Sequence, residues 1–123
     1  MLGGTFEKDS EEYQIHCALK REGKKQFKKN KKEYKRLMDH VGQFPIVVIA
    51  PTDADIINGG SELRRKFLDS VISQMDREYL ATLVKYNKAL QQRNALLKYF
   101  FENRTFSEAD LDVWDVQLAS LGQ

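Results

Sequence analysis

The spacing of apolar residues changes near residue 52, and this change limits the fold more than any other feature of the chain. Before it, Tyr13, Ile15 and Cys17 alternate with Gln14 and His16, as in a strand with one buried face. Beyond residue 60, apolar residues recur at helical spacing. The sequence therefore predicts an α+β fold: short antiparallel β-strands in the N-terminal part, followed by a three-helix, partly coiled-coil-like domain.

Polar or glycine-containing turns separate the expected strands, which are Thr5 to Lys8, Tyr13 to Lys20, Lys24 to Lys29 and Tyr34 to Leu37. Asn30 and Lys31 suit a hairpin turn, because asparagine tolerates left-handed backbone angles. Phe44 to Ala50 is rich in β-branched residues, which predicts one more strand, a buried one that ends at Pro51. We expect these segments to form antiparallel strands.

Three apolar stripes predict three helices. The first stripe runs from Leu63 to Met75, and Asp76 offers a break after it. Ser107 begins a capping-box-like motif with Asp110, ahead of the third stripe. Between them, the second stripe follows a heptad in which two asparagines can set the register of packed helices: Leu80, Leu83, Asn87, Leu90, Asn94, Leu97 and Phe101. We expect Leu90 and Leu97 to be core positions between the three helices.

The basic residues are concentrated in one segment, although the net charge of the chain is only +2. Ten of the twenty Lys and Arg residues lie between Lys20 and Arg36, where only Glu22 and Glu33 oppose them. Such a segment can attract polyanions. The candidates for contact with nucleic-acid phosphate are Lys24, Lys25, Lys28, Lys29, Lys31 and Lys32. A solvated hairpin, whose lysines prevent edge-to-edge pairing of strands, explains the same composition, and both interpretations stay open.

Composition argues against several other classes of protein. The longest apolar run, Ile46 to Ala50, is far shorter than the roughly 20 residues that span a bilayer, and the N-terminal residues have no signal-peptide core. We therefore expect a cytoplasmic protein without membrane contact. Cys17 is the only cysteine, so no internal disulfide can form, and we interpret it as a small buried side chain or a residue without a specific role. No metal site and no catalytic site are expected from the residues present.

Several blocks of sequence carry a family resemblance. They are the basic hairpin, Val41 to Asp53, a Gly-Gly-x-x-x-Arg-Arg-x-Phe-Leu-Asp stretch from Gly59 to Asp69, Tyr86-Asn87, Gln92-Arg93-Asn94 and Leu111 to Asp115. In this order, the blocks resemble the RecF family, bacterial recombination and repair ATPases of the ABC and Smc-like class. The resemblance covers the chain from about Thr5 to Gly122.

The resemblance implies a DNA-binding ATPase of recombinational repair and replication restart, linked to the SOS response, that helps to load recombinase at DNA gaps. ATP and magnesium would be its cofactors. Its partners would be duplex or gapped DNA, RecR, RecO and, with ATP bound, a second copy, and it would be cytoplasmic and nucleoid-associated. However, the chain has no Gly-rich phosphate loop, no ABC signature and no paired acids for magnesium. We therefore expect an internal fragment with no cofactor and no catalytic activity of its own.

The resemblance also implies a division of the chain and a set of site residues. Residues 1–51 would be the β-rich part of the ATPase lobe with the basic hairpin, and residues 52–123 the helical second domain. Thr52 and Asp53 would lie in the loop that senses nucleotide in ABC-type ATPases, although aspartate is also a favoured helix cap. Arg64 and Arg65 could contact DNA phosphate or pair with carboxylates. The sequence leaves these choices open.

A helical protein-interaction module with a basic nucleic-acid-binding hairpin is the alternative function. Its apolar helix face would bind a protein partner, but truncation of a larger protein would expose similar residues. An independent metabolic enzyme is the weakest interpretation, because no nucleophile with paired acids, metal-ligand cluster or Gly-rich loop supports it.

Overall fold

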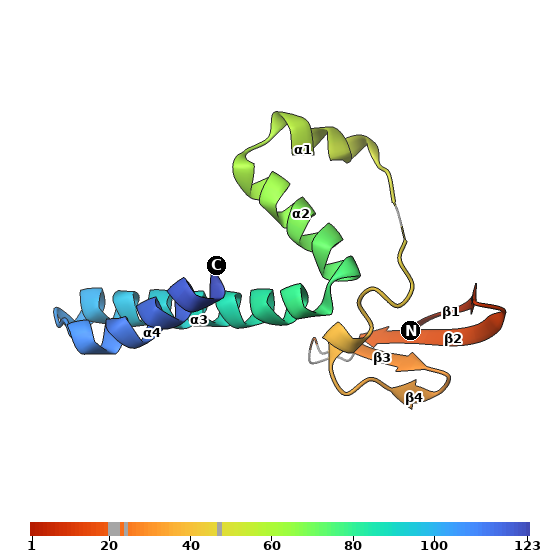
Figure 1. Cartoon of the computed structure of the whole chain (residues 1–123), viewed down its shortest axis with the longest axis horizontal. Coiled ribbons are helices and arrows are strands. Elements are labelled where there is room, and N and C mark those ends of the chain that lie inside the picture. Colours follow the sequence, from red (N-terminus) through yellow and green to blue (C-terminus); the bar gives the residue numbers. More distant parts are fainter. Residues whose placement is uncertain (20–22, 24, 47) are drawn as a thin grey trace. The chain divides into compact units, whose positions relative to one another are not determined.

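The computed structural model describes residues 1–19, 23, 25–46 and 48–123. These residues divide into two compact units, Met1–Met75 and Asp76–Gln123, which are described separately below (Figure 1). The first unit contains an antiparallel sheet and two α-helices, and the second contains two α-helices. The predicted α+β fold is thus confirmed. The predicted boundary after residue 51 concerns the lobes of a larger protein and stays a prediction.

The sheet has four antiparallel strands that are neighbours in chain order: β1 (Leu2–Lys8), β2 (Glu11–Leu19), β3 (Lys25–Lys29) and β4 (Lys32–Glu33). Asn30 and Lys31 form the turn between β3 and β4 with φ angles of 48° and 68°, and this confirms the predicted hairpin turn. Asp9 and Ser10 make a similar turn between β1 and β2, with φ angles of 54° and 64°. Left-handed angles at both turn residues match the twist of the flanking strands.

Two of the predicted strands are wrong. Tyr34 to Leu37 is irregular and leads into a 3₁₀ turn, η1 (Leu37–Asp39), because pairing with β3 ends at Glu33. The described residues of Phe44 to Ala50 form no strand either. A strand needs a neighbour for its backbone hydrogen bonds, and no described strand pairs with this run, whose Ile49 is 86% exposed.

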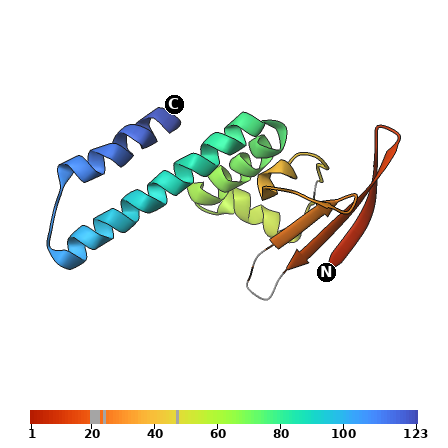
Figure 2. The same ribbon diagram turned by 90° about the horizontal axis from the view of Figure 1, so that it is seen from below.

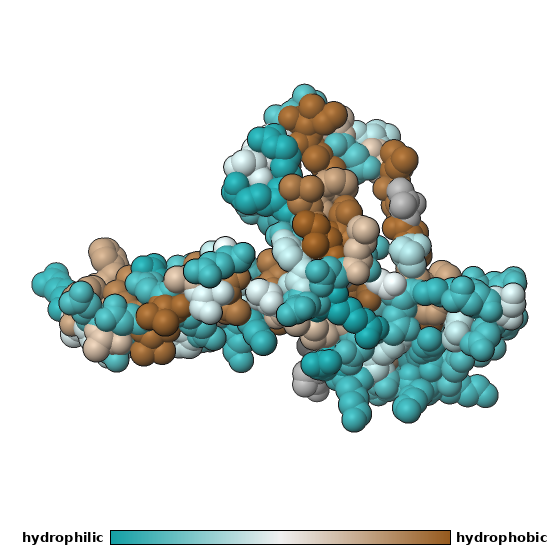
Figure 3. All heavy atoms as spheres, viewed as in Figure 1, coloured by the Kyte–Doolittle hydropathy of each residue, from teal (hydrophilic) through white to brown (hydrophobic). Residues whose placement is uncertain are grey.

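The first unit continues with a second 3₁₀ turn, η2 (Pro51–Asp53), and the helices α1 (Ala54–Asn58) and α2 (Ser61–Met75). Gly42 adopts φ +76°, and a Cβ atom there would lie only 2.2 Å from the carbonyl oxygen of Gln74 in α2. The chain therefore needs glycine at this position. Apolar residues of α2, including Phe67 and Leu68, are largely exposed, and Figure 3 shows apolar side chains at the surface over this helix.

The second unit is a hairpin of α3 (Arg77–Asn103) and α4 (Glu108–Leu121), which lie side by side (Figure 2). Asp76 caps α3, because its carboxylate accepts hydrogen bonds from the backbone N–H groups of Glu78 and Tyr79 at 2.8 and 2.9 Å. Ser107 caps α4 by accepting a bond from the N–H of Asp110. Both helix starts are where the sequence predicts them.

The packing seam of α3 differs from the predicted heptad. Ala89 and Phe100 are buried, and Arg93 lies between them at helical spacing and bonds Asp115 of α4. By contrast, Leu90 is only half-buried, while Leu97 and both heptad asparagines are exposed. The small side chain of Ala89 and the Arg93–Asp115 ion pair thus direct α4 to a face of α3 next to the predicted heptad face. A prediction based on large apolar residues alone does not find this face. The predicted packing of α2 on α3 stays a prediction.

The adjacent residues Phe100 and Phe101 test this seam, because Phe100 is 8% exposed and Phe101 is 86% exposed. Phe100→Ala should lower the free energy of unfolding of the second unit by about 3 kcal/mol, as expected for a buried large-to-small change. Phe101→Ala should change it by less than about 0.5 kcal/mol. The measurement is denaturant unfolding followed by fluorescence of Trp114, the single tryptophan, which lies in α4. Equal losses in the two variants would contradict the observed seam.

Candidate nucleic-acid interface

The register of the strands divides their side chains between two faces of the sheet. Residues directly opposite one another on neighbouring strands point to the same face. Phe6 lies opposite Tyr13, and Cys17 opposite Phe27. The face that carries these residues together with Lys29 is called the aromatic face. The opposite face carries Gly3, His16, Ala18, Gln26 and Lys28, together with the polar residues Thr5, Glu7, Glu12 and Gln14.

Three residues that follow β4, Tyr34, His40 and Phe44, cover the aromatic face. Phe44 lies 5.2 Å from Phe6 and 5.5 Å from Tyr13, measured between ring centroids. His40 lies 4.9 Å from Phe27 and 5.2 Å from Tyr34. Tilted and edge-on ring pairs at such distances stabilise a fold beyond the area that they bury. The aromatic cluster, defined as these six rings, therefore fixes the segment after β4 to the sheet.

Lys29 belongs to this cluster. Its ammonium nitrogen lies 4.0 Å from the ring centroid of Tyr13 and donates a hydrogen bond to Oε1 of Gln43 at 3.2 Å. Lys8 donates to the backbone carbonyl of Gln43, also at 3.2 Å. A cation over an aromatic face contributes about 0.5–2 kcal/mol, depending on exposure. The cation at Lys29 thus has protein partners, unlike an ammonium group that is free to meet a phosphate.

Burial in the cluster changes the proton affinity of two side chains. Burial lowers the pKa of His40 below its ordinary value, and the positive charge of Lys29 lowers it further. Burial also raises the pKa of Tyr34. The neutral form of His40 is therefore favoured in the folded unit. Sequence analysis missed the roles of Lys8, His40 and Gln43, because they become neighbours only once the hairpin register places the rings.

The other predicted phosphate contacts on the sheet are without ion pairs to described residues: Lys25, Lys28, Lys31 and Lys32. Lys25, Lys31 and Lys32 are exposed, and Lys28 is half-buried. Lys24 lies outside the described residues. The structure thus brings these four lysines onto β3, β4 and the turn between them. Such ammonium groups are positioned to meet a polyanion.

The predicted arginines lie on α2 rather than on the sheet. Arg64 donates a hydrogen bond to the backbone carbonyl of Gly59 at 2.9 Å. Arg65 is exposed, and its charge contributes to the lowered pKa of Glu62, whose main cause is the hydrogen bond from Lys66. Contact of either arginine with DNA stays a prediction.

Thr52 and Asp53 lie in η2. Asp53 accepts a hydrogen bond from the backbone N–H of Ala50 at 2.8 Å, but makes no side-chain bond to the N-terminus of α1. Thr52 is exposed. These two residues form no phosphate cradle by themselves, because a cradle of the phosphate-loop type uses several successive backbone N–H groups. Their link to nucleotide stays a prediction.

The described part of the chain contains no group of three or more His, Cys, Asp or Glu residues that could hold a metal ion. Cys17 is a free thiol of intermediate burial. None of the helices among these residues is long and apolar enough to cross a membrane.

The whole chain is similar to proteins named "DNA replication and repair protein RecF", although no family model matches it. It is 52% identical to the protein of Phocaeicola vulgatus over 124 residues, which cover 100% of this chain and 33% of that protein. Identity to the protein of Flavobacterium johnsoniae is 47% over 123 residues, covering 100% of this chain and 34% of the other. The chain thus spans about a third of the length of the curated relatives that it matches.

Solved structures agree with these relatives. A chain described as the recombination mediator protein RecF-ATPrS in the RecFOR pathway superimposes with a TM-score of 0.86 at 36% identity, covering 98% of this chain and 32% of that one. A second chain, described as RecF-ATP in the same pathway, gives a TM-score of 0.82 at 37% identity. The match covers 90% of this chain and 30% of that one. The fold seen here is therefore that of one segment of those proteins.

The lowered pKa of His40 makes the stability of the sheet depend on pH. As pH falls, the unfolded chain binds a proton at His40 near the ordinary value of 6.5, before the folded unit does. The contribution of neutral His40 to the stability of the sheet is therefore fully present above that value. It is lost as the pH falls toward the lowered pKa of His40 in the folded unit. Denaturant unfolding followed by NMR signals of β2 should show this loss between about pH 7.5 and about pH 5.5.

His40→Gln is the matched variant, since it removes the titrating group from the cluster. It should weaken the pH dependence of the sheet over this range. Trp114 fluorescence supplies an internal control, because the unit Asp76–Gln123 contains no histidine. A pH dependence that is unchanged in His40→Gln would contradict the assignment to His40.

Proposed function

Since this chain belongs to the RecF family, as a segment about a third as long as its relatives, we propose that it contributes DNA-binding and helical parts to an ATPase of recombinational repair and replication restart. The observation that carries the proposal is 52% identity along the whole chain to a protein named for DNA replication and repair. The four unpaired lysines of the sheet add a surface that suits the phosphates of DNA.

The nucleotide chemistry of the proposed protein requires residues that this chain lacks. Similar chains are described as RecF-ATP and RecF-ATPrS, which supports the use of ATP by the full-length protein. We propose that magnesium accompanies the nucleotide and that Thr52 and Asp53 lie in the linked loop. The chain alone has no Gly-rich phosphate loop, so its own residues do not hold the phosphates of ATP.

The proposed partners are duplex or gapped DNA, RecR, RecO and a second copy of the full-length protein. The RecFOR pathway named for the similar structures supports RecR and RecO. Loading of recombinase, a link to the SOS response and a cytoplasmic, nucleoid-associated location complete the proposal. A soluble role agrees with the absence of a membrane-spanning helix among the described residues.

A protein-interaction module is the second candidate function. It is favoured by the exposed apolar residues of the second unit, among them Leu97, Phe101, Val113 and Val116. DNA binding that depends on the sheet lysines would favour the first candidate. Binding of a protein to the helices without any affinity for DNA would favour the second.

The missing phosphate loop predicts that the chain does not bind ATP by itself. Isothermal titration calorimetry with magnesium and ATP should show no saturable heat at micromolar to low millimolar nucleotide, because no backbone cradle or lysine holds the phosphates. A tight, magnesium-dependent isotherm would refute the assignment of the ATPase motifs to other parts of the full-length protein.

Duplex DNA should bind the chain weakly and without sequence preference, since the described lysines reach phosphate but form no base-reading motif. If all four unpaired lysines contact phosphate, log affinity should fall against log salt with a slope of about −3 to −4, at roughly −0.9 for each contact. Fluorescence anisotropy of a labelled duplex at several salt concentrations measures this slope. A slope near zero would rule out the basic sheet as an electrostatic interface.

A further inference from the structure

Lys28 and Lys29 are consecutive residues of β3 and therefore point to opposite faces of the sheet. Lys29 lies opposite Ile15 on the aromatic face, where Tyr13 and Gln43 already hold its ammonium group. Lys28 lies opposite His16 on the other face. The two lysines thus differ in their surroundings although they are adjacent in sequence.

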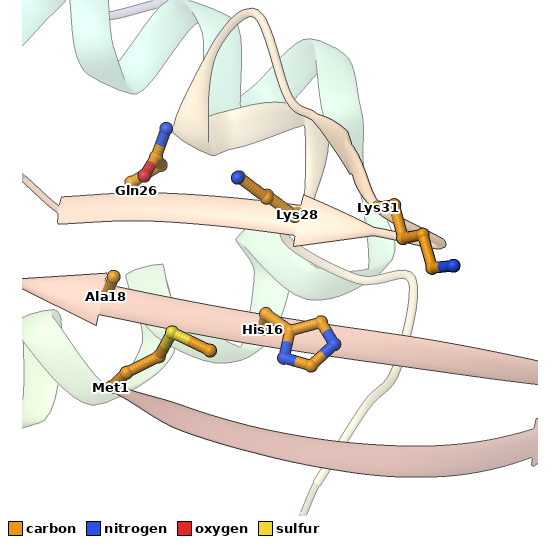
Figure 4. Close-up of a pocket in the computed structure, with 6 residues that line it drawn as sticks. All are labelled: Met1, His16, Ala18, Gln26, Lys28 and Lys31. Carbon is orange, nitrogen blue, oxygen red and sulfur yellow. The ribbon is translucent and has the colours of Figure 1, made fainter.

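The face that carries Lys28 is hollowed (Figure 4). The residues lining this hollow are Met1, His16, Ala18, Gln26, Lys28 and Lys31. They come from β2, β3, the turn before β4 and the residue that precedes β1. The hollow thus lies over β2 and β3 and is lined by two lysines and a histidine.

His16 contributes a polar atom without a partner. Its Nδ1 atom is buried and forms no hydrogen bond in the described structure. The ring lies against Gly3, where a Cβ atom would come within 2.8 Å of Nδ1. A glycine opposite His16 therefore leaves space for the imidazole on this face. A buried nitrogen without a partner is costly.

Two carboxylates, those of Glu12 and Glu33, lie near the lysines of the hollow without forming an ion pair with them. Glu33 lies opposite Lys28, but its carboxylate accepts a hydrogen bond from Gln26, and Lys28 forms no ion pair with a described residue. Glu12 lies in a separate, neighbouring depression next to Lys31, again without an ion pair. The hollow is thus lined by two lysines that form no ion pair with a described residue, although Glu12 and Glu33 lie nearby.

We propose that this hollow is a phosphate subsite for nucleic acid, contacted by Lys28 and Lys31, and that Lys29 supports the aromatic cluster without contacting phosphate. This assignment rests on the proposed DNA binding of the sheet and selects one of its faces. An ammonium group is a strong donor to a phosphate oxygen, and both lysines can approach a strand of DNA without disturbing the cluster.

Three single variants of the full chain test the assignment: Lys28→Gln, Lys31→Gln and Lys29→Gln. Each variant removes one positive charge, so the three variants have the same net charge. For duplex DNA, Lys28→Gln and Lys31→Gln should each make the salt slope less steep by about 0.9. Neither should lower the melting temperature of the sheet. Lys29→Gln should keep the slope of the unmodified chain and lower that melting temperature, because Tyr13 and Gln43 lose their cation.

Inorganic pyrophosphate separates the subsite from the wider proposal of DNA binding. NMR signals of the lysine Cε atoms should shift saturably for Lys28 and Lys31 on addition of pyrophosphate, and the signal of Lys29 should stay in place. If the subsite binds pyrophosphate but the chain does not bind duplex DNA, the subsite stands and the proposed function fails.

Other outcomes overturn the subsite. DNA binding whose slope responds to Lys29→Gln, but not to Lys28→Gln, would place the phosphates on the aromatic face. Equal responses of all three lysines to DNA and pyrophosphate would indicate diffuse attraction. No response to either probe would leave the hollow without an anion. A polyglutamate peptide that binds more tightly than DNA through the same two lysines would assign the hollow to an acidic protein partner.

Discussion

Contact between the aromatic cluster and one face of the sheet is the interaction on which the first unit depends. The sheet is small, and within the first unit no described helix packs across it, so its apolar face needs another cover. Rings from the segment after β4 supply that cover, and Lys8 and Lys29 both bond Gln43 beside Phe44. Lys29, one basic residue of the hairpin, therefore contributes to holding this cover on the sheet.

If Lys29 supports the aromatic cluster while Lys28 and Lys31 contact phosphate, a lysine-rich hairpin can be both ordered and available to a polyanion. Alternation along β3 sends Lys29 into the cluster and Lys28 to the other face. The second face carries the hollow, and neither Lys28 nor Lys31, which line it, forms an ion pair with a described residue. Under the proposed function, such a face would offer contacts to phosphate that hold DNA without reading its sequence.

Local chemistry made part of this structure predictable from sequence. Asn30 in its turn, the break between helices at Asp76 and the helix cap Ser107 lie where expected, because each needs only its neighbours in the chain. It was harder to predict which face of a helix or strand packs against another element. The seam of α3 uses Ala89 and Arg93, whose roles depend on α4, and the run Phe44 to Ala50 lacks a described partner strand. The separate roles of Lys28 and Lys29 follow from strand register, which composition does not contain.

Lysine reactivity is the most direct test of the central claim that the two faces of the sheet have different roles. The unmodified chain would be treated with an acetylating reagent, with and without duplex DNA, and each lysine quantified by mass spectrometry. The account predicts that Lys28 and Lys31 react readily and are protected by DNA, whereas Lys29 reacts slowly in both samples because its ammonium group is held over Tyr13. Rapid reaction at Lys29 that DNA suppresses, with Lys28 unaffected, would contradict it.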